Sequence, residues 1–135
     1  MTEITKGSCL CGGVSYTING ALSNVTTCHC RQCRKQSGHY YAAARTQQSH
    51  FQIKDEDGLI KWYRSSDEAS RGFCSNCGSA LFWKYDNSSY MSVLVGSIDG
   101  DTNLETGEHI FIESKGDYYQ LDDNIPQFQT IDPSR

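Results

Sequence analysis

Apolar and polar side chains alternate along several short segments of this chain. Val14, Tyr16 and Ile18 are separated by polar residues, and a period of two is typical of a β-strand with one buried face. Similar apolar runs predict further strands at residues 40–45, 51–53, 59–63, 80–83, 90–98 and 109–112. Helical periodicity is weak, with short helical turns expected at residues 31–36 and 46–49. The pattern therefore predicts a mainly β protein.

Polar stretches and prolines indicate where regular structure stops. Residues 99–107 are polar and predict a loop, and both prolines lie near the end of the sequence. An irregular C-terminal tail is therefore expected from about residue 116. The 135 residues, of which 37% are hydrophobic, suit one domain with a lean core. We expect residues 1–135 to form a single domain in which something other than apolar burial adds stability.

The charge balance argues against several classes of partner. The chain has 12 Lys and Arg against 16 Asp and Glu, a net charge of -4. Proteins that bind nucleic acids or anionic membranes usually carry a surplus of basic residues. No apolar run approaches the roughly 18 residues of a transmembrane helix, and none near the start has signal-peptide length. A cytoplasmic protein with no nucleic-acid or membrane partner is therefore expected.

The seven cysteines form three short clusters. These are Cys9-Leu-Cys11, Cys28-His-Cys30-Arg-Gln-Cys33 and Cys74-Ser-Asn-Cys77. In a reducing compartment such clusters indicate metal ligands or catalytic thiols, and an odd number suits disulfides poorly. On an extended strand Cys9 and Cys11 project to the same side. Cys74 and Cys77 are spaced as in a zinc knuckle, with Gly78 completing the tight turn.

Two such pairs could complete a zinc site with four sulfur ligands, as in structural zinc sites. Cys28, Cys30 and Cys33 would then remain, and three protein ligands with an open fourth position are typical of catalytic zinc. Spacing leaves other pairings open, because Cys28 and Cys30 could instead share a site with Cys74 and Cys77. The three-cysteine group could also be closed by a histidine. His29 is the nearest candidate, but it should point away from its two neighbours.

Long motifs surround these cysteines. They are Gly7-Ser8-Cys9-Leu10-Cys11-Gly12-Gly13-Val14, Cys28-His29-Cys30-Arg31-Gln32-Cys33-Arg34-Lys35-Gln36-Ser37-Gly38 and Arg71-Gly72-Phe73-Cys74-Ser75-Asn76-Cys77-Gly78-Ser79-Ala80-Leu81-Phe82. With residues 109–115 and 125–128, they resemble the glutathione-dependent formaldehyde-activating enzyme and centromere protein V family over nearly the whole chain. The resemblance implies a fold of the β-tent type, mainly β, with small antiparallel sheets around a structural zinc.

The resemblance also assigns the cysteines by position. The structural zinc would have four ligands, which are Cys9, Cys11, Cys74 and Cys77. The catalytic-like zinc would have three, which are Cys28, Cys30 and Cys33. Two Zn²⁺ ions per chain are therefore expected. The implied activity is that of a carbon–sulfur lyase, the condensation of formaldehyde with glutathione to S-(hydroxymethyl)glutathione.

The chemistry of a three-thiolate site agrees with this activity. Three thiolates around Zn²⁺ leave a net charge of about −1, so the site should prefer a soft thiolate ligand. Arg31, Arg34 and Lys35 alternate with the ligands and are predicted to bind a glutathione carboxylate, although solvated charges on a turn explain them equally. His29 and His109 are candidate proton carriers, although hydrogen-bonded structural histidines explain them too.

The expected substrates are therefore a thiol such as glutathione and a small aldehyde. The alternative is a non-catalytic zinc-binding module of the centromere protein V type, because relatives of that kind are associated with chromatin. The net charge of -4 and the absence of a long Lys/Arg run count against this alternative.

Overall fold

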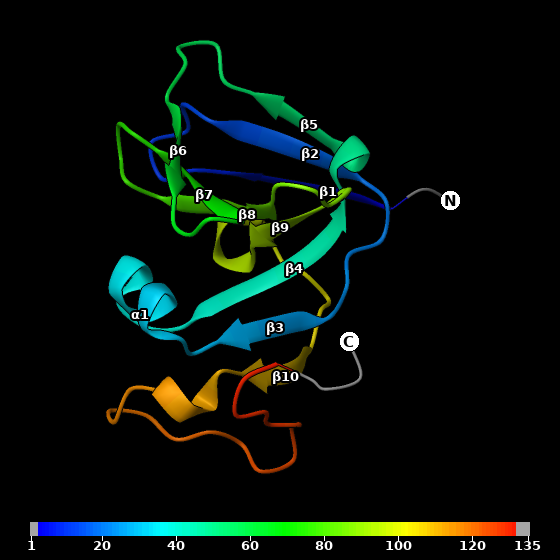
Figure 1. Cartoon of the computed structure of the whole chain (residues 1–135). Helices are drawn as coiled ribbons and strands as arrows, with labels where there is room; N and C mark the ends of the chain where they lie inside the picture. Colours follow the sequence, from blue (N-terminus) through cyan, green and yellow to red (C-terminus); the bar gives the residue numbers. More distant parts are fainter. Residues whose placement is uncertain (1–2, 132–135) are drawn as a thin grey trace. The chain divides into compact units, whose positions relative to one another are not determined.

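The computed structural model describes residues 3–131 and is mainly β (Figure 1). The chain divides into two compact units. The first contains the residues up to Ser23 and residues Ala44–Asn103, and the second contains residues Asn24–Ala43 and those from Leu104 onward. That both units form a single domain stays a prediction. No helix of the described part is long and apolar enough to cross a membrane.

A three-stranded antiparallel sheet lies in the first unit. Its strands, in spatial order, are β1 (Ile4–Ser8), β2 (Ser15–Asn19) and β5 (Phe51–Lys54). The buried face of β2 carries Tyr16 and Ile18, as the alternating pattern predicts. Gly12 adopts a φ of 78° in the turn between β1 and β2, a left-handed conformation that favours glycine. This turn brings the start of β2 back alongside β1.

The remaining strands of the first unit form a longer antiparallel series. It comprises β6 (Ile60–Arg64), β7 (Ala69–Cys74), β8 (Ala80–Tyr85) and β9 (Tyr90–Leu94), each paired with the next. The part of β4 (Tyr41–Gln47) from Ala44 onward also belongs to this unit. The short 3₁₀ turns η1 (Gln48–His50) and η2 (Val95–Ser97) follow β4 and β9. The apolar core of this unit includes Phe82, Leu81 and Val93, which are fully buried.

The second unit is built around β3 (Val25–Cys28). This strand pairs antiparallel with the first part of β4 and parallel with β10 (Thr106–Ile110). The helix α1 (Arg31–Ser37) follows β3 directly, and the 3₁₀ turn η3 (Ile112–Ser114) follows β10. Residues 115–131 form turns and bends. They are attached to β10, where the His109 N–H donates to the Pro126 carbonyl at 2.9 Å.

The predicted mainly β fold is confirmed, with corrections to particular elements. The sequence pattern missed three strands, β1, β3 and β7. In β7 the side chains of Ser70 and Arg71 are buried together with their apolar neighbours, so both faces are covered and no alternation is visible. The strand expected at residues 90–98 ends at Leu94, where η2 begins. The strand expected at residues 109–112 is shifted to 106–110, which also shortens the expected loop.

Candidate functional site

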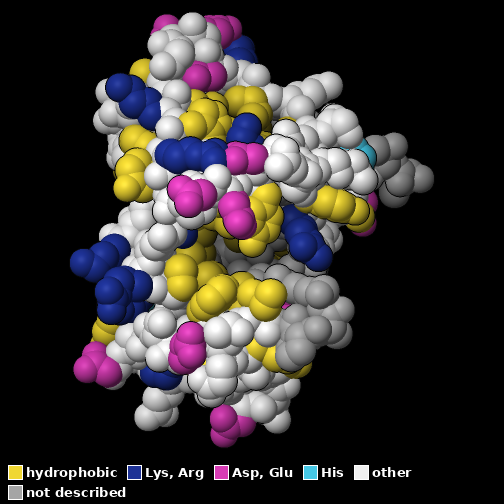
Figure 2. Space-filling view, in the orientation of Figure 1, with side chains coloured by type: hydrophobic (Ala, Val, Ile, Leu, Met, Phe, Trp, Pro, Cys, Tyr) yellow, Lys and Arg dark blue, Asp and Glu magenta, His cyan; other side chains and the backbone are white. Residues whose placement is uncertain are grey.

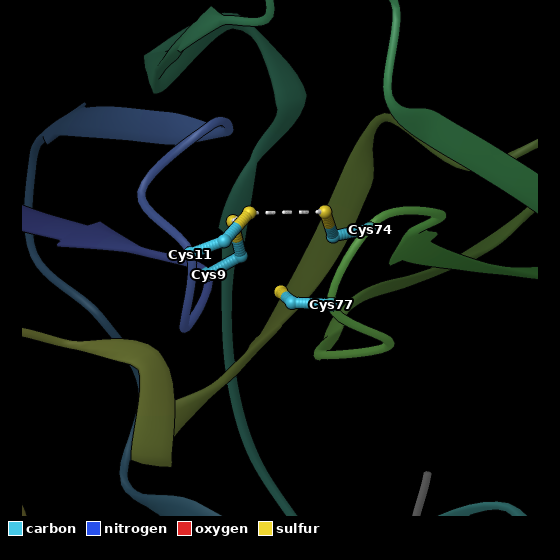
Figure 3. Close-up of side chains that lie close together, drawn as sticks. All are labelled: Cys9, Cys11, Cys74 and Cys77. Atoms are coloured by element: carbon cyan, nitrogen blue, oxygen red, sulfur yellow. Dashed lines mark hydrogen bonds between the residues drawn. The ribbon is translucent and has the colours of Figure 1, made fainter.

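Four cysteine sulfurs of the first unit come together from two distant segments. Cys9 and Cys11 lie in the turn after β1, while Cys74 ends β7 and Cys77 lies in the turn after it. All four Sγ atoms are within 4.8 Å of one another, and Figure 3 shows them pointing toward a common centre. Gly78 has a φ of 81°, and its N–H donates to the Cys74 carbonyl at 2.8 Å. This tight turn places the second pair of sulfurs opposite the first.

The spacing of these sulfurs suits a tetrahedral metal site. Cys9 Sγ lies 3.6 Å from Cys11 Sγ, and Cys11 Sγ lies 3.8 Å from Cys74 Sγ, the contact drawn as a dashed line in Figure 3. Four sulfurs at the Zn–S distance of about 2.3 Å around one ion are separated by roughly 3.8 Å. A disulfide requires about 2 Å, and all of these cysteines are free. The four-cysteine group could therefore hold a metal ion.

Hydrogen bonds favour the ionised form of two of these thiols. Ser79 Oγ lies 3.3 Å from Cys77 Sγ, and this hydrogen bond, together with hydrogen bonds from the main chain of Ser79 and Cys11, lowers the pKa of Cys77 to about 5. The side chain of Asn76 lowers the pKa of Cys11 in the same way. Cysteine binds metals as the thiolate, so these contacts favour the form that a ligand needs.

The second group of sulfurs belongs to the second unit and is local in sequence. Cys28 ends β3, Cys30 is the N-terminal cap of α1, and Cys33 lies inside the helix. Their Sγ atoms lie within 4.8 Å of one another, and the Cys33 N–H donates to Cys30 Sγ at 3.3 Å. Among residues 3–131 no histidine, carboxylate or further cysteine joins this group. It therefore offers three sulfur ligands.

The negative charge that the three thiolates of this second group would carry also suits a bound metal ion. Hydrogen bonding with Cys30 and Cys33 raises the pKa of Cys28 well above its ordinary value, and burial raises it further. Three thiolates this close repel one another, so they cannot all ionise without a nearby positive charge. A cation bound by the three sulfurs would supply that charge, and thiolates are suitable ligands for Zn²⁺.

Basic side chains gather on α1, next to the three-cysteine group in sequence. Arg31 and Lys35 are exposed and Arg34 is half-buried, and Figure 2 shows Lys and Arg side chains gathered over this helix. The Arg34 Nε–H donates to the Ser114 carbonyl at 3.2 Å. The three predicted anion-binding residues therefore lie together, and one of them is held in place by η3.

His29 and His109 are buried and hydrogen-bonded to their surroundings, at 0% and 6% exposure. Thr27 Oγ1 lies 2.9 Å from His29 Nε2 and is also hydrogen-bonded to His109 Nδ1. Burial lowers the pKa of His29 to about 4 and lowers the pKa of His109 as well. Both rings are therefore neutral at pH 7. This arrangement favours the structural interpretation of the two histidines over that of proton carriers.

The sequence did not predict two hydrogen-bond partners of these histidines. Thr27 bridges the histidines, and Tyr119 Oη lies 2.6 Å from His29 Nδ1. Tyr119 is 90 residues from His29 in the chain, so no local spacing relates the two. The similarity of residues 109–115 to a known family was the nearest signal, and it stops short of Tyr119.

Comparisons with known proteins agree with these observations. The sequence model of a family described as "Glutathione-dependent formaldehyde-activating enzyme" matches residues 4–114. A Schizosaccharomyces pombe protein named as an uncharacterized lyase is 28% identical over 129 residues, which cover 94% of this chain and 91% of that protein. A crystal structure of a Rhodobacter sphaeroides protein has a TM-score of 0.58 and 23% identity, covering 73% of this chain and 91% of its own. This last likeness concerns the fold alone.

Proposed function

This chain belongs to the glutathione-dependent formaldehyde-activating enzyme family, and we propose that it is a zinc-dependent carbon–sulfur lyase acting on a thiol–aldehyde adduct. Its substrates would be a thiol such as glutathione and a small aldehyde such as formaldehyde. The three-cysteine group of Cys28, Cys30 and Cys33 carries the proposal, because it offers three ligands where a closed site needs four. The name of the S. pombe relative supports the reaction class.

The proposed reaction joins a thiol to an aldehyde without any redox change. A bond forms between the thiol sulfur and the carbonyl carbon, while the carbonyl π electrons move to the oxygen. The thiol proton is transferred overall to that oxygen, which gives a hemithioacetal. The lyase direction breaks the same carbon–sulfur bond and returns the proton to sulfur.

Several side chains of this protein would bind and orient the substrate. A zinc ion held by the three thiolates would supply a centre that prefers a soft thiolate ligand. Arg31, Arg34 and Lys35 would bind the carboxylates of glutathione, and the contact of Arg34 with the Ser114 carbonyl would hold its guanidinium in position. The hydrogen-bonded histidines receive no proton-transfer role in this proposal.

The metal content is the first test. We expect protein purified gently, without added thiol reductant, to contain two zinc ions per chain, because the four-cysteine and three-cysteine groups can each bind one. Elemental analysis by mass spectrometry, normalised to protein concentration, measures this directly. A content of one ion or none would contradict the proposal of two metal sites.

Glutathione binding is the second test. We expect calorimetry to show that glutathione binds and that its affinity falls several-fold between low and high salt, because exposed charges are screened. A variant combining Arg31→Ala and Lys35→Ala should bind glutathione more weakly at low salt, whereas Lys61→Ala, an exposed position on β6, is the matched control. S-methylglutathione keeps both carboxylates but has no free thiol, so it should bind more weakly than glutathione.

The same titration separates the two candidate functions. Competition between glutathione and a zinc-binding dye for one of the two ions would support the enzyme. Two bound ions with no heat from glutathione and no adduct turnover would contradict it and would favour a non-catalytic zinc-binding module.

A further inference from the structure

A series of hydrogen bonds connects Tyr119 of the C-terminal tail to His109 of β10. It passes through His29, the residue between Cys28 and Cys30. Tyr119 Oη lies 2.6 Å from His29 Nδ1, and His29 Nε2 lies 2.9 Å from Thr27 Oγ1. Thr27 Oγ1 is hydrogen-bonded in turn to His109 Nδ1. Gly116 contributes its N–H to Tyr119 Oη at 3.3 Å. Of these residues His29, Thr27 and His109 are buried, at 0%, 2% and 6% exposure.

The donors and acceptors of this series are consistent with one direction. The Gly116 N–H can only donate, so the Tyr119 oxygen accepts from it and the hydroxyl proton is available for His29 Nδ1. The His29 ring then carries its proton on Nε2 and donates to Thr27 Oγ1. The Thr27 hydroxyl proton is left for His109 Nδ1. With this assignment every bond in the series has one donor and one acceptor, and the Tyr119 hydroxyl is its first side-chain donor.

The hydrogen-bonded side chains lie on one face of the second unit's sheet, and Cys28 lies on the other. His109 pairs with Thr27 and Ile110 pairs with Cys28 in the parallel register of β10 and β3. Side chains alternate along strands, so Thr27, His109 and the following His29 share a face. Their mutual contacts agree with this placement. The hydrogen-bonded network therefore lies on the face of the sheet opposite to the side chain of Cys28.

His29 is held by both its ring and its main chain. The ring contacts Tyr119 and Thr27, while the His29 N–H donates to the Ile110 carbonyl at 3.0 Å. Since His29 is the residue between Cys28 and Cys30, fixing it restricts how far the two flanking sulfurs can move apart.

Tyr119 is itself fixed by contacts independent of His29. The Lys115 ammonium donates to the Tyr119 carbonyl at 2.7 Å, and its Nζ lies 4.8 Å from the centre of the Tyr119 ring. The ring also packs edge-on against Tyr40 and His39, with centroids 5.6 and 4.7 Å away. The hydroxyl is therefore presented to His29 by a side chain with restricted freedom.

We propose that Tyr119 is a positioning residue for the three-cysteine group, acting through His29 and Thr27. The proposal rests on the proposed function, because it takes Cys28 and Cys30 as metal ligands. Residues that support metal ligands through hydrogen bonds commonly change metal affinity by about 10–100-fold when they are replaced. Here the supported element is the main chain between two ligands.

Tyr119→Phe, which removes only the hydroxyl, is the direct test. Co²⁺ is the probe, because its visible absorption reports the geometry of a sulfur site. We expect two equivalents to bind, with the affinity of the three-cysteine group about 10–100-fold below wild type and that of the four-cysteine group unchanged. The difference spectrum against Cys33→Ser isolates the three-cysteine group, and its absorption bands should shift. Tyr118→Phe is the matched control, since Tyr118 is 57% exposed.

A pair of substitutions at Thr27 decides the question even if Tyr119→Phe fails to fold. Thr27→Val keeps the shape of this buried strand residue but loses the hydroxyl, so it should weaken Co²⁺ binding like Tyr119→Phe. Thr27→Ser keeps the hydroxyl and should restore affinity and absorption bands close to wild type. A purely structural role of Thr27 would lower the melting temperature without changing the bands.

The outcomes separate this inference from the proposed function. A wild-type chain that binds a single Co²⁺ equivalent overturns the proposed function and the inference with it. Two equivalents in the wild type, with unchanged affinity and bands in both Tyr119→Phe and Thr27→Val, overturn the inference alone.

Discussion

Replacing Cys74 with serine should leave the chain unfolded or insoluble. Cys11 and Cys74 are 63 residues apart in sequence, yet their sulfurs lie 3.8 Å from each other, so an ion bound there closes a long loop. A structural zinc of this kind contributes on the order of 10 kcal/mol or more to folding. Whole domains are stable by only about 5–15 kcal/mol. The free energy of folding lost when the site can no longer bind its ion is therefore comparable with the total stability of a domain.

The surrounding core increases this dependence. Cys9 and Cys74 are buried within the same apolar cluster as Val14 and Phe82. In Cys74→Ser a hydroxyl would replace this buried sulfur beside apolar side chains, and the ion would no longer join Cys9 to it. A buried polar group without a partner is unfavourable, so the core itself would be disrupted.

Far-UV circular dichroism, thermal melting and size-exclusion chromatography measure the effect of Cys74→Ser. Ser75→Ala, at the adjacent exposed position of the same turn, is the control and should retain the wild-type melting temperature. A strong chelator added to the wild type should reproduce the unfolding. A cooperative transition of Cys74→Ser at the wild-type temperature would contradict a structural role for the four-cysteine group.

Cys33→Ser makes the same chemical change in the other group, and it should give a folded but inactive protein. The three cysteines lie within one short segment, so an ion bound there closes a loop too small to stabilise the fold strongly. Local contacts already hold that segment: Ser37 Oγ donates to the Cys33 carbonyl at 2.7 Å, and the Gly38 N–H donates to the Arg34 carbonyl at 2.8 Å. Both contacts use main-chain groups that the substitution leaves in place.

The expected results for Cys33→Ser are a near wild-type dichroism spectrum, one metal ion fewer per chain, and adduct formation from glutathione and formaldehyde at the uncatalysed rate. Cys74→Ser and Cys33→Ser are each other's controls, because both replace one sulfur with oxygen. If Cys33→Ser unfolded as completely as Cys74→Ser, the three-cysteine group would be structural. The proposal of a lyase would then lose its main support.

The local patterns predicted most of the strands, because a strand with one buried face shows itself as a period of two. Val14, Tyr16 and Ile18 illustrate this, since all three are buried as the alternation requires. The pattern failed where burial is not one-sided. Along β7 the polar residues Ser70 and Arg71 are buried like the apolar Ala69, so the polarity of a residue did not indicate its exposure.

Sequence spacing alone established that the chain carries cysteine pairs suited to metal binding, since residues two or three apart are brought together by a strand or a turn. The long motifs around those pairs indicated the family. The tertiary structure decided which pairs meet, because packing of the turn after β1 near the end of β7, two elements of different sheets, brings Cys11 to Cys74. It also decided that His29 packs against Tyr119, 90 residues away. Contacts between distant segments depend on how strands, turns and the tail pack together, and no local pattern of residues encodes that packing.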